Sequence, residues 1–353
     1  QSDSNVRKIS NHITKKVADS LHDIYKKDRK EFEEKWDNVK LFIQYGMLSD
    51  EKFYERAEKF ALLKNTDGKY FTFEEYKELI KANQTDKDDK LVYLYATDEK
   101  DQYTYIEKAK AKGYDVLLMD GQLDTHFVNQ LEQKFENATF QRVDADVLDK
   151  LIRKDDSTDT ALPQDEQDDL MPVFRSQIDH PDNFIVAFES LKDEEQPLLI
   201  TQSEFMRRMR DMSEMGGGGM DIYGQLPNSY NLVVNTEHPL VQQVIADKNN
   251  KLGDKLKEVK EKIRPVKEEK DKLEKAQDDK KEEEVSQEEK DQLEAKEKEV
   301  NQLNDEKENM LKEYASQNKL VKQMIDLALL ANNMLKGKDL DKFVKRSVEL
   351  IQK

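Results

Sequence analysis

Residues 248–317 are mostly charged, yet their few apolar residues recur at a fixed spacing. In the first half they lie seven residues apart, with two more offset by four: Leu252, Val259, Val266 and Leu273, then Leu256 and Ile263. In the second half two seven-residue frames recur, one interrupted by Lys307: Leu293, Val300 and Tyr314, then Leu303 and Met310. This spacing keeps apolar side chains on one helix face, so it predicts an antiparallel helical hairpin around a polar turn near residues 278–286.

Each arm of this hairpin would be ~35–40 Å long at 1.5 Å per residue. The alternative is a disordered charged spacer, which the same composition permits. Pro265 weakens the first arm, because proline removes a helical hydrogen bond.

The charge and the missing cysteines exclude several classes of protein. The net charge of −17 argues against nucleic acid or an anionic membrane as a partner. No segment approaches the ~20 apolar residues of a membrane span, and the start has no signal-peptide pattern. Without cysteine there are no disulfides, thiolate nucleophiles or cysteine zinc sites, which fits the cytoplasm. The 353 residues begin with Gln1 rather than methionine, so we expect a fragment of a longer protein.

The first half of the chain changes its periodicity once. Residues 1–85 show the three-to-four-residue spacing of helices, including one over residues 31–45 that Gly46 could end and one over 53–63. Residues 86–155 instead alternate short apolar runs at 91–96, 116–119 and 140–143 with helical stretches. This alternation predicts right-handed βαβ crossovers and a small parallel sheet.

The second half reads as an acidic linker followed by an α+β domain. Residues 156–170 are acidic and lack apolar periodicity, whereas 171–353 contain expected strands at 183–190, 198–200 and 229–235. The hairpin of residues 248–317 is an insertion in this domain, and two strongly apolar helices end the chain. We therefore expect an α+β, mostly helical fold: a helical segment, a small αβα subdomain, and an α+β dimerisation domain with a terminal helix bundle. A symmetric interface between two copies would bury the terminal helices; packing within one chain is the alternative.

One short segment, Gln202–Met220, concentrates methionine and then four glycines. The spacing Thr201-x-x-Glu204 predicts a capping box at the start of a helix. Its apolar stripe contains Phe205, Met206, Met209, Met212 and Met215, while Arg207, Arg208 and Arg210 fill the remaining face. The residues alone leave two interpretations open: core filler packed on a sheet, or an adaptable exposed surface, because thioethers repack easily around partners.

We find no self-contained catalytic signature. The five histidines are scattered without an HExxH-type pair, so no metal site is expected. The glycines at 216–219 lack the GxxxxGK[ST] pattern of a phosphate loop, and no GxSxG serine elbow is present.

Several motifs in order resemble the ninety-kilodalton heat-shock chaperone family. They are LLKNTDGKYFTFEEY at Leu62–Tyr76, KGYDVLLMDGQLD at Lys112–Asp124, SYNLVVNTEHPLV at Ser229–Val241 and MIDLALLA at Met324–Ala331. The resemblance covers residues 1–247 and 318–353, and leaves the hairpin as a departure from the family. It implies the latter part of the middle domain, followed by the C-terminal dimerisation domain.

The resemblance also implies a function and its residues. The family is an ATP-dependent chaperone, so the intact protein would bind ATP and Mg²⁺, whereas this fragment would hold no cofactor and would not hydrolyse ATP. Gln1 matches a glutamine that assists hydrolysis. Non-native client proteins would bind the stripe from Phe205 to Met215, with Phe205 anchoring it to the sheet, and would also contact His126, where one bacterial branch has tryptophan, and Asn129. The expected homodimer contacts are Leu320, Met324, Leu327, Ala328, Leu330, Ala331, Phe343, Val344 and Leu350. The alternative function is a coiled-coil scaffold whose charged arm is the functional part.

Overall fold

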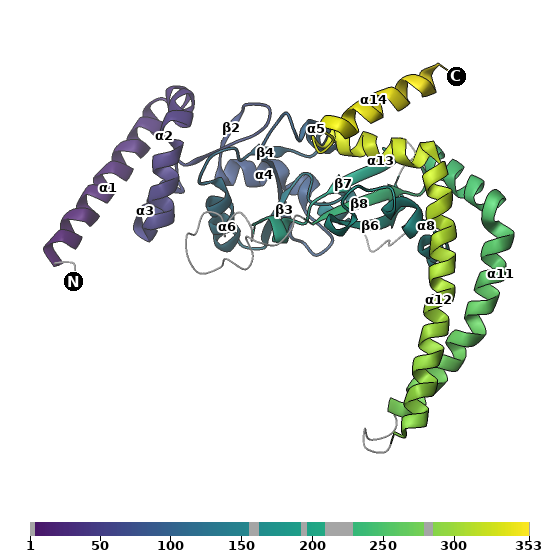
Figure 1. Cartoon of the computed structure of the whole chain (residues 1–353). Helices are drawn as coiled ribbons and strands as arrows, with labels where there is room; N and C mark the ends of the chain where they lie inside the picture. Colours follow the sequence, from purple (N-terminus) through teal and green to yellow (C-terminus); the bar gives the residue numbers. More distant parts are fainter. Residues whose placement is uncertain (1–3, 155–161, 192–195, 209–228, 279–284, 353) are drawn as a thin grey trace. The chain divides into compact units, whose positions relative to one another are not determined.

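The computed structural model describes all residues except 1–3, 155–161, 192–195, 209–228, 279–284 and 353 (Figure 1). The chain forms two compact units, which interleave in sequence. Unit 1 contains Gln1–Ser157 and Thr201–Ser229, and unit 2 contains Thr158–Ile200 and Tyr230–Lys353. The expected α+β, mostly helical fold class is confirmed. The division into four segments at residues 85, 155 and 170 remains a prediction.

Unit 1 begins with three helices, α1 (Ser4–Lys27), α2 (Arg29–Ser49) and α3 (Glu51–Ala57). Buried aromatic side chains, with Trp36 at 1% exposure, join them into one core. Two sequence-based boundaries were wrong. Gly46 does not end α2, because the helix continues until Asp50 caps both α2 and α3. The helix expected over residues 53–63 stops early, and its end forms β1 (Leu62–Lys64), which pairs antiparallel with β2 (Tyr70–Thr72).

A three-stranded parallel sheet follows, as the alternation of strands and helices predicted. After α4 (Phe73–Gln84), the strands β3 (Leu91–Ala96), β4 (Val116–Leu118) and β5 (Ala138–Arg142) pair in the order β4-β3-β5. The helices α5 (Tyr103–Ala111) and α6 (Asp124–Lys134) form the crossovers, and the short α7 (Leu148–Leu151) follows β5. Every residue of β3 is buried, as expected for a central strand covered on both faces.

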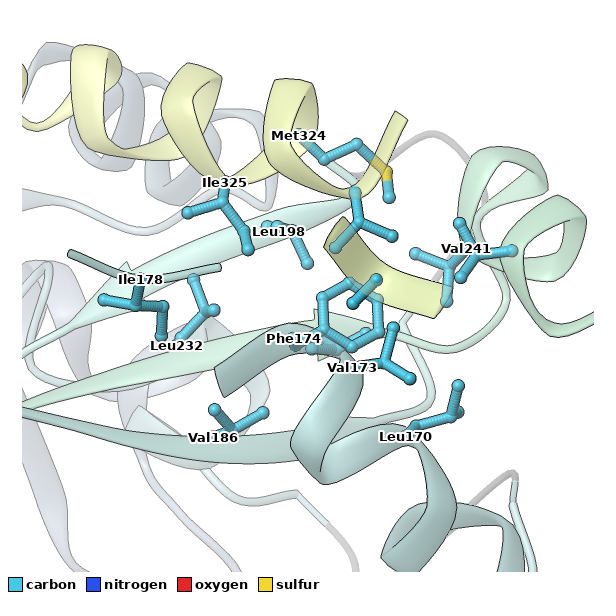
Figure 2. Close-up of a cluster of buried hydrophobic side chains, with 14 of the residues drawn as sticks. Leu170, Val173, Phe174, Ile178, Val186, Leu198, Leu232, Val241, Met324 and Ile325 are labelled. Carbon is cyan, nitrogen blue, oxygen red and sulfur yellow. The ribbon is translucent and has the colours of Figure 1, made fainter. Parts of the chain in front are cut away.

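Unit 2 is built on a second three-stranded sheet, with the order β6-β8-β7. Its strands are β6 (Phe184–Glu189), β7 (Leu198–Thr201) and β8 (Tyr230–Asn235), close to the expected positions, and a short 3-10 turn η1 (Pro181–Asn183) precedes β6. Figure 2 shows side chains of this sheet, such as Val186 and Leu232, meeting Phe174 of α8 (Gln164–Arg175) and Ile325 of α13 (Lys319–Ala331). The last helix, α14 (Gly337–Ile351), follows α13.

The charged insertion is a helical hairpin, formed by α11 (Pro239–Asp278) and α12 (Gln287–Gln317), which lie side by side in Figure 1. Leu256, Val259 and Val300 of the apolar pattern are buried, and Leu252 and Leu256 pack against the core of unit 2. Helix α11 continues through Pro265 without a break. The hairpin expectation is therefore confirmed over the described residues.

Part of the acidic stretch expected to be a linker is instead the first half of α8, where carboxylates anchor the hairpin. Glu166 lies 2.9 Å from Lys248 Nζ of α11. Asp169 lies 3.3 Å from Lys307 Nζ of α12, and it also contacts Lys260 of α11. These ion pairs join one face of α8 to both arms.

Among the helices that the structure describes, none has the length and the apolar character needed to cross a membrane.

Candidate functional site

The described start of the methionine segment, residues 201–208, belongs to unit 1. Thr201 is buried as the last residue of β7, and a helical turn covers residues 204–208. The capping box expected at Thr201 was therefore wrong, because its residue lies in a strand and the helix begins later. Instead Gln202 donates its backbone N–H to the carbonyl of Asp144 at 3.1 Å, which ties this segment to the end of β5.

Glu204 is the centre of a hydrogen-bonded cluster at the sheet of unit 1. Its carboxylate accepts from the hydroxyl of Tyr95 on β3 and, at 2.9 Å, from Arg207 Nη2. The same guanidinium contacts the Tyr95 hydroxyl, and Arg207 is only 4% exposed. Burial raises the pKa of Tyr95, so this hydroxyl stays protonated and donates to the carboxylate.

Arg208 joins the same turn to α6 and β5. Its Nη1 donates to Asn129 Oδ1 at 3.0 Å and to Glu132 Oε2 at 2.6 Å, both on α6. Its Nη2 donates to the carbonyl of Phe140 on β5 at 2.6 Å, and its Nε donates to Glu204. We call Glu204, Arg207 and Arg208, with Tyr95 and Glu132, the arginine latch.

The charges of the latch balance. Two guanidinium groups face two carboxylates, Glu204 and Glu132. Burial opposes ionisation of Glu204, but the charges of Arg207 and Arg208 outweigh it and hold the pKa of this carboxyl below its usual range. Glu204 is therefore ionised at neutral pH.

The latch turns the apolar side chains of the segment outward. Phe205 is 67% exposed and Met206 is 36% exposed, so the expectation that Phe205 anchors the helix to a sheet was wrong. The anchors are Arg207 and Arg208, which the sequence analysis placed only on the face that the apolar stripe leaves free. Met209, Met212 and Met215 lie outside the described residues, as does Gln1.

The two expected client surfaces meet at Arg208. Asn129 on α6 accepts from this guanidinium, so it is joined directly to the turn that carries Phe205 and Met206. His126, also on α6, is partly exposed. One sequence signal pointed to this junction: Tyr95 lies in a fully apolar strand, and a buried tyrosine hydroxyl needs a hydrogen-bond partner. The identity of that partner had no sequence signal.

The expected dimer residues divide into buried and exposed groups within unit 2. Met324, Ala328 and Phe343 belong to the core of the unit. Leu327, Leu330 and Val344 are 36–50% exposed, and the neighbouring Val348 and Ile351 are exposed too. Ala331 is also exposed and Leu320 is partly buried, while the side chain of Leu350 is not described. The apolar side chains that α13 and α14 leave exposed are therefore those of the second group.

Ion pairs fix α14 against α13. Arg346 of α14 contacts the buried carboxylate of Asp326 and donates to Gln323 Oε1 at 2.8 Å. Lys322 adds a contact of 3.1 Å to Asp326. These contacts hold the exposed side chains of the two helices in a fixed arrangement.

No group of three histidine or carboxylate side chains in the described part of the chain could hold a metal ion.

Comparison with known proteins adds the family. A family model described as "Hsp90 protein" matches residues 1–263, and the match ends within α11. The chain is 50% identical to the chaperone protein HtpG of Bacteroides thetaiotaomicron and 48% identical to that of Porphyromonas gingivalis, each over 99% of this chain and 52% of the relative. The HtpG of Bdellovibrio bacteriovorus is 29% identical over 42% of this chain and 24% of its own length. The chain thus spans about half the length of the curated relatives it matches most fully.

Proposed function

Because this chain belongs to the Hsp90 protein family, we propose that it is the client-holding and self-associating part of a molecular chaperone. Non-native proteins expose apolar side chains, and many weak contacts with an adaptable apolar surface would keep them from aggregating. In this proposal Phe205, Met206, His126 and Asn129 contact the client, and Met209, Met212 and Met215 extend the surface. The observation that carries the proposal is the outward exposure of Phe205 and Met206 on a turn fixed by buried arginines.

Self-association would place two such surfaces in one particle. We propose that two copies pair through α13 and α14, using Leu327, Leu330, Val344, Val348 and Ile351. Exposed apolar side chains on two helices that contact each other support this pairing, because burying them gains free energy. Met324, Ala328 and Phe343 of the same two helices are buried in the core of unit 2 and hold the helices in place.

ATP would act through a part of the protein outside these 353 residues. We propose that the intact protein is a cytoplasmic ATPase that binds ATP with Mg²⁺, as the family resemblance implies, and that Gln1 assists hydrolysis there. None of the described residues is assigned to the nucleotide. The role of this chain in the cycle is to hold the client and to join the two copies.

The ordered hairpin supports a second candidate function, a scaffold that binds partners through its charged arm. Its heptad stripe and its ion pairs to α8 are features of an ordered structural element rather than of a disordered spacer. We favour the chaperone, because the apolar residues of the hairpin are buried rather than offered to a partner: Leu256, Leu311 and Tyr314 lie in the core of unit 2, and Val259 and Val300 are buried as well.

The client surface is tested by replacing Phe205 and Met206 with serine. Both side chains are exposed, so we expect the variant to fold normally and to lose suppression of client aggregation, measured by light scattering of a heat-denatured test protein. Ile185→Ser, at an exposed apolar residue of unit 2, is the matched control. Unchanged suppression by the double variant would contradict the proposed surface.

A further inference from the structure

The guanidinium of Arg208 makes more hydrogen bonds than are needed to keep this side chain packed. Its nitrogens donate to four groups from three elements: Glu204 on its own turn, Asn129 and Glu132 on α6, and the carbonyl of Phe140 on β5. Its side chain is only 12% exposed. A planar fork with several fixed donors determines orientation as well as distance.

The acceptors around Arg208 are themselves held in place. Glu132 Oε1 accepts from the hydroxyl of Thr139 at 2.7 Å and from the backbone N–H of Phe140 at 2.8 Å. Its other carboxylate oxygen accepts from Arg208. Neither partner can therefore rotate without losing several hydrogen bonds.

Stability alone is a poor reason for such a cluster. Apolar residues of similar volume often stabilise a fold as well as a buried ion pair or better, because the charges lose their hydration. What the ion cluster provides, and apolar contacts would not, is one orientation of the turn. Phe205 and Met206 come directly before Arg207 and Arg208 in the sequence. The cluster therefore determines the orientation of these two exposed side chains.

We propose that Arg208 is a positioning residue for client binding, which fixes the turn of residues 204–208 on α6 so that Phe205 and Met206 form one surface with the exposed side of that helix. The proposal rests on the proposed function. Arg208 does not touch the client in this arrangement; it acts through the orientation of its neighbours. Arg207 and Glu204 complete the arrangement from the Tyr95 side.

The variant Arg208→Lys tests the proposal, because it keeps the charge and removes the fork. We expect about tenfold weaker binding of reduced, carboxymethylated α-lactalbumin, a permanently unfolded probe, measured by fluorescence anisotropy. Hydrogen exchange without the probe should speed up at the amides of residues 204–208. Arg56→Lys, at a more exposed arginine of unit 1 that pairs with Asp19, is the matched control and should change neither measurement.

A double-mutant cycle separates positioning from a general loss of stability. If Arg208 acts through Phe205 and Met206, Arg208→Lys should cost no further affinity once both are serine. An additive loss of affinity, or unchanged exchange at residues 204–208, would overturn the proposal. Thr139→Val removes a donor that holds Glu132 in place without changing any charge, so it supplies a milder variant if Arg208→Lys folds poorly.

The cycle also separates this proposal from the proposed function. If the two serine substitutions leave probe affinity unchanged, the client surface is wrong and Arg208 has nothing to position. If they weaken binding but Arg208→Lys does not, the client surface stands and the positioning role fails.

Discussion

Asp169 Oδ2 lies 2.6 Å from Lys260 Nζ, although the side chain of Asp169 is only 3% exposed. Lys307 from the other arm contacts the second oxygen of the same carboxylate, at 3.3 Å. One acidic residue of α8 therefore holds both arms of the hairpin.

Asp169→Ala should destabilise unit 2 strongly. Removing one partner from a buried ionic cluster leaves the remaining charges uncompensated, which typically costs about 3–5 kcal/mol. Urea unfolding followed by helical circular dichroism measures the loss. Asp165→Ala is the control: this carboxylate also pairs with Lys260 but is 74% exposed, so its removal should cost less than about 1 kcal/mol. Equal effects of the two variants would show that the buried cluster does not stabilise the hairpin.

Glu75 gives unit 1 a specific dependence on pH. A bidentate hydrogen bond from Arg29 lowers the pKa of Glu75 from 4.5 to about 2. Because the folded-state pKa is the lower one, this contribution is complete above pH 4.5 and is lost as the pH falls towards 2. Both side chains are more than one-third exposed, so we expect Glu75→Gln to lower the free energy of unfolding by about 1 kcal/mol at neutral pH.

The single tryptophan, Trp36, is buried in unit 1, so its fluorescence follows this unfolding directly. The difference between the parent chain and Glu75→Gln should shrink to nothing near pH 2. Glu78→Gln is the control, because its contact with Lys81 is long, at 3.8 Å, and exposed. A stability difference that stays constant with pH would exclude the Arg29–Glu75 pair as its source.

The proposed dimer should dissociate when α14 is made polar. Val344 and Val348 are one helical turn apart and about half exposed, so Val344→Asp with Val348→Asp puts two carboxylates on one face. Losing the burial of two valines, worth ~1.5–3 kcal/mol each, should weaken association at least about 100-fold. Sedimentation or light scattering over a range of protein concentrations measures the dissociation of the dimer. Lys342→Asp, on the other side of α14, is the control and should leave the dimer intact. A parent chain that is monomeric at every concentration would refute the proposed pairing.

Shortening the hairpin decides between the chaperone and the scaffold. The arms face each other near Glu269 and Lys296, so residues 267–298 can be replaced by a short glycine-serine turn. The anchoring lysines 248, 260 and 307 all lie outside the deletion. We expect unchanged suppression of client aggregation and an unchanged dimer. Loss of suppression with normal folding would favour the charged arm as the functional part.

Periodicity predicted most of this fold, because it reports which face of an element is apolar. The hairpin and the terminal helices follow from spacings of three to four or seven residues, and the strands of both sheets follow from short apolar runs that interrupt this spacing. Periodicity does not report which polar side chains become buried. Asp169 reads like any other acid in an acidic stretch, although its partner Lys307 lies 138 residues away.

The same limit applies to the candidate site. The exposure of Met206 was one of two open interpretations, and the resemblance favoured it, whereas Phe205 was expected to anchor the helix and is exposed instead. The role of Arg207 and Arg208 was missed, because arginine on a helix face ordinarily points to solvent. The contact of Arg208 with Glu132 joins residues 76 apart in the sequence, and no local pattern encodes such a pairing.

Unit 1 takes the turn of residues 204–208 from a stretch that the chain reaches only after β6 and β7 of unit 2. A ribosome makes the N-terminal part first, at about 5–20 residues per second, so Glu132 precedes Arg208 by about 4–15 s of synthesis. During that interval the parallel sheet of unit 1 is complete, but Tyr95 and Glu132 still lack their arginine partners. A nascent chain therefore completes the sheet residues before it gains the arginines that fix the proposed client surface, and the order of synthesis separates the two events.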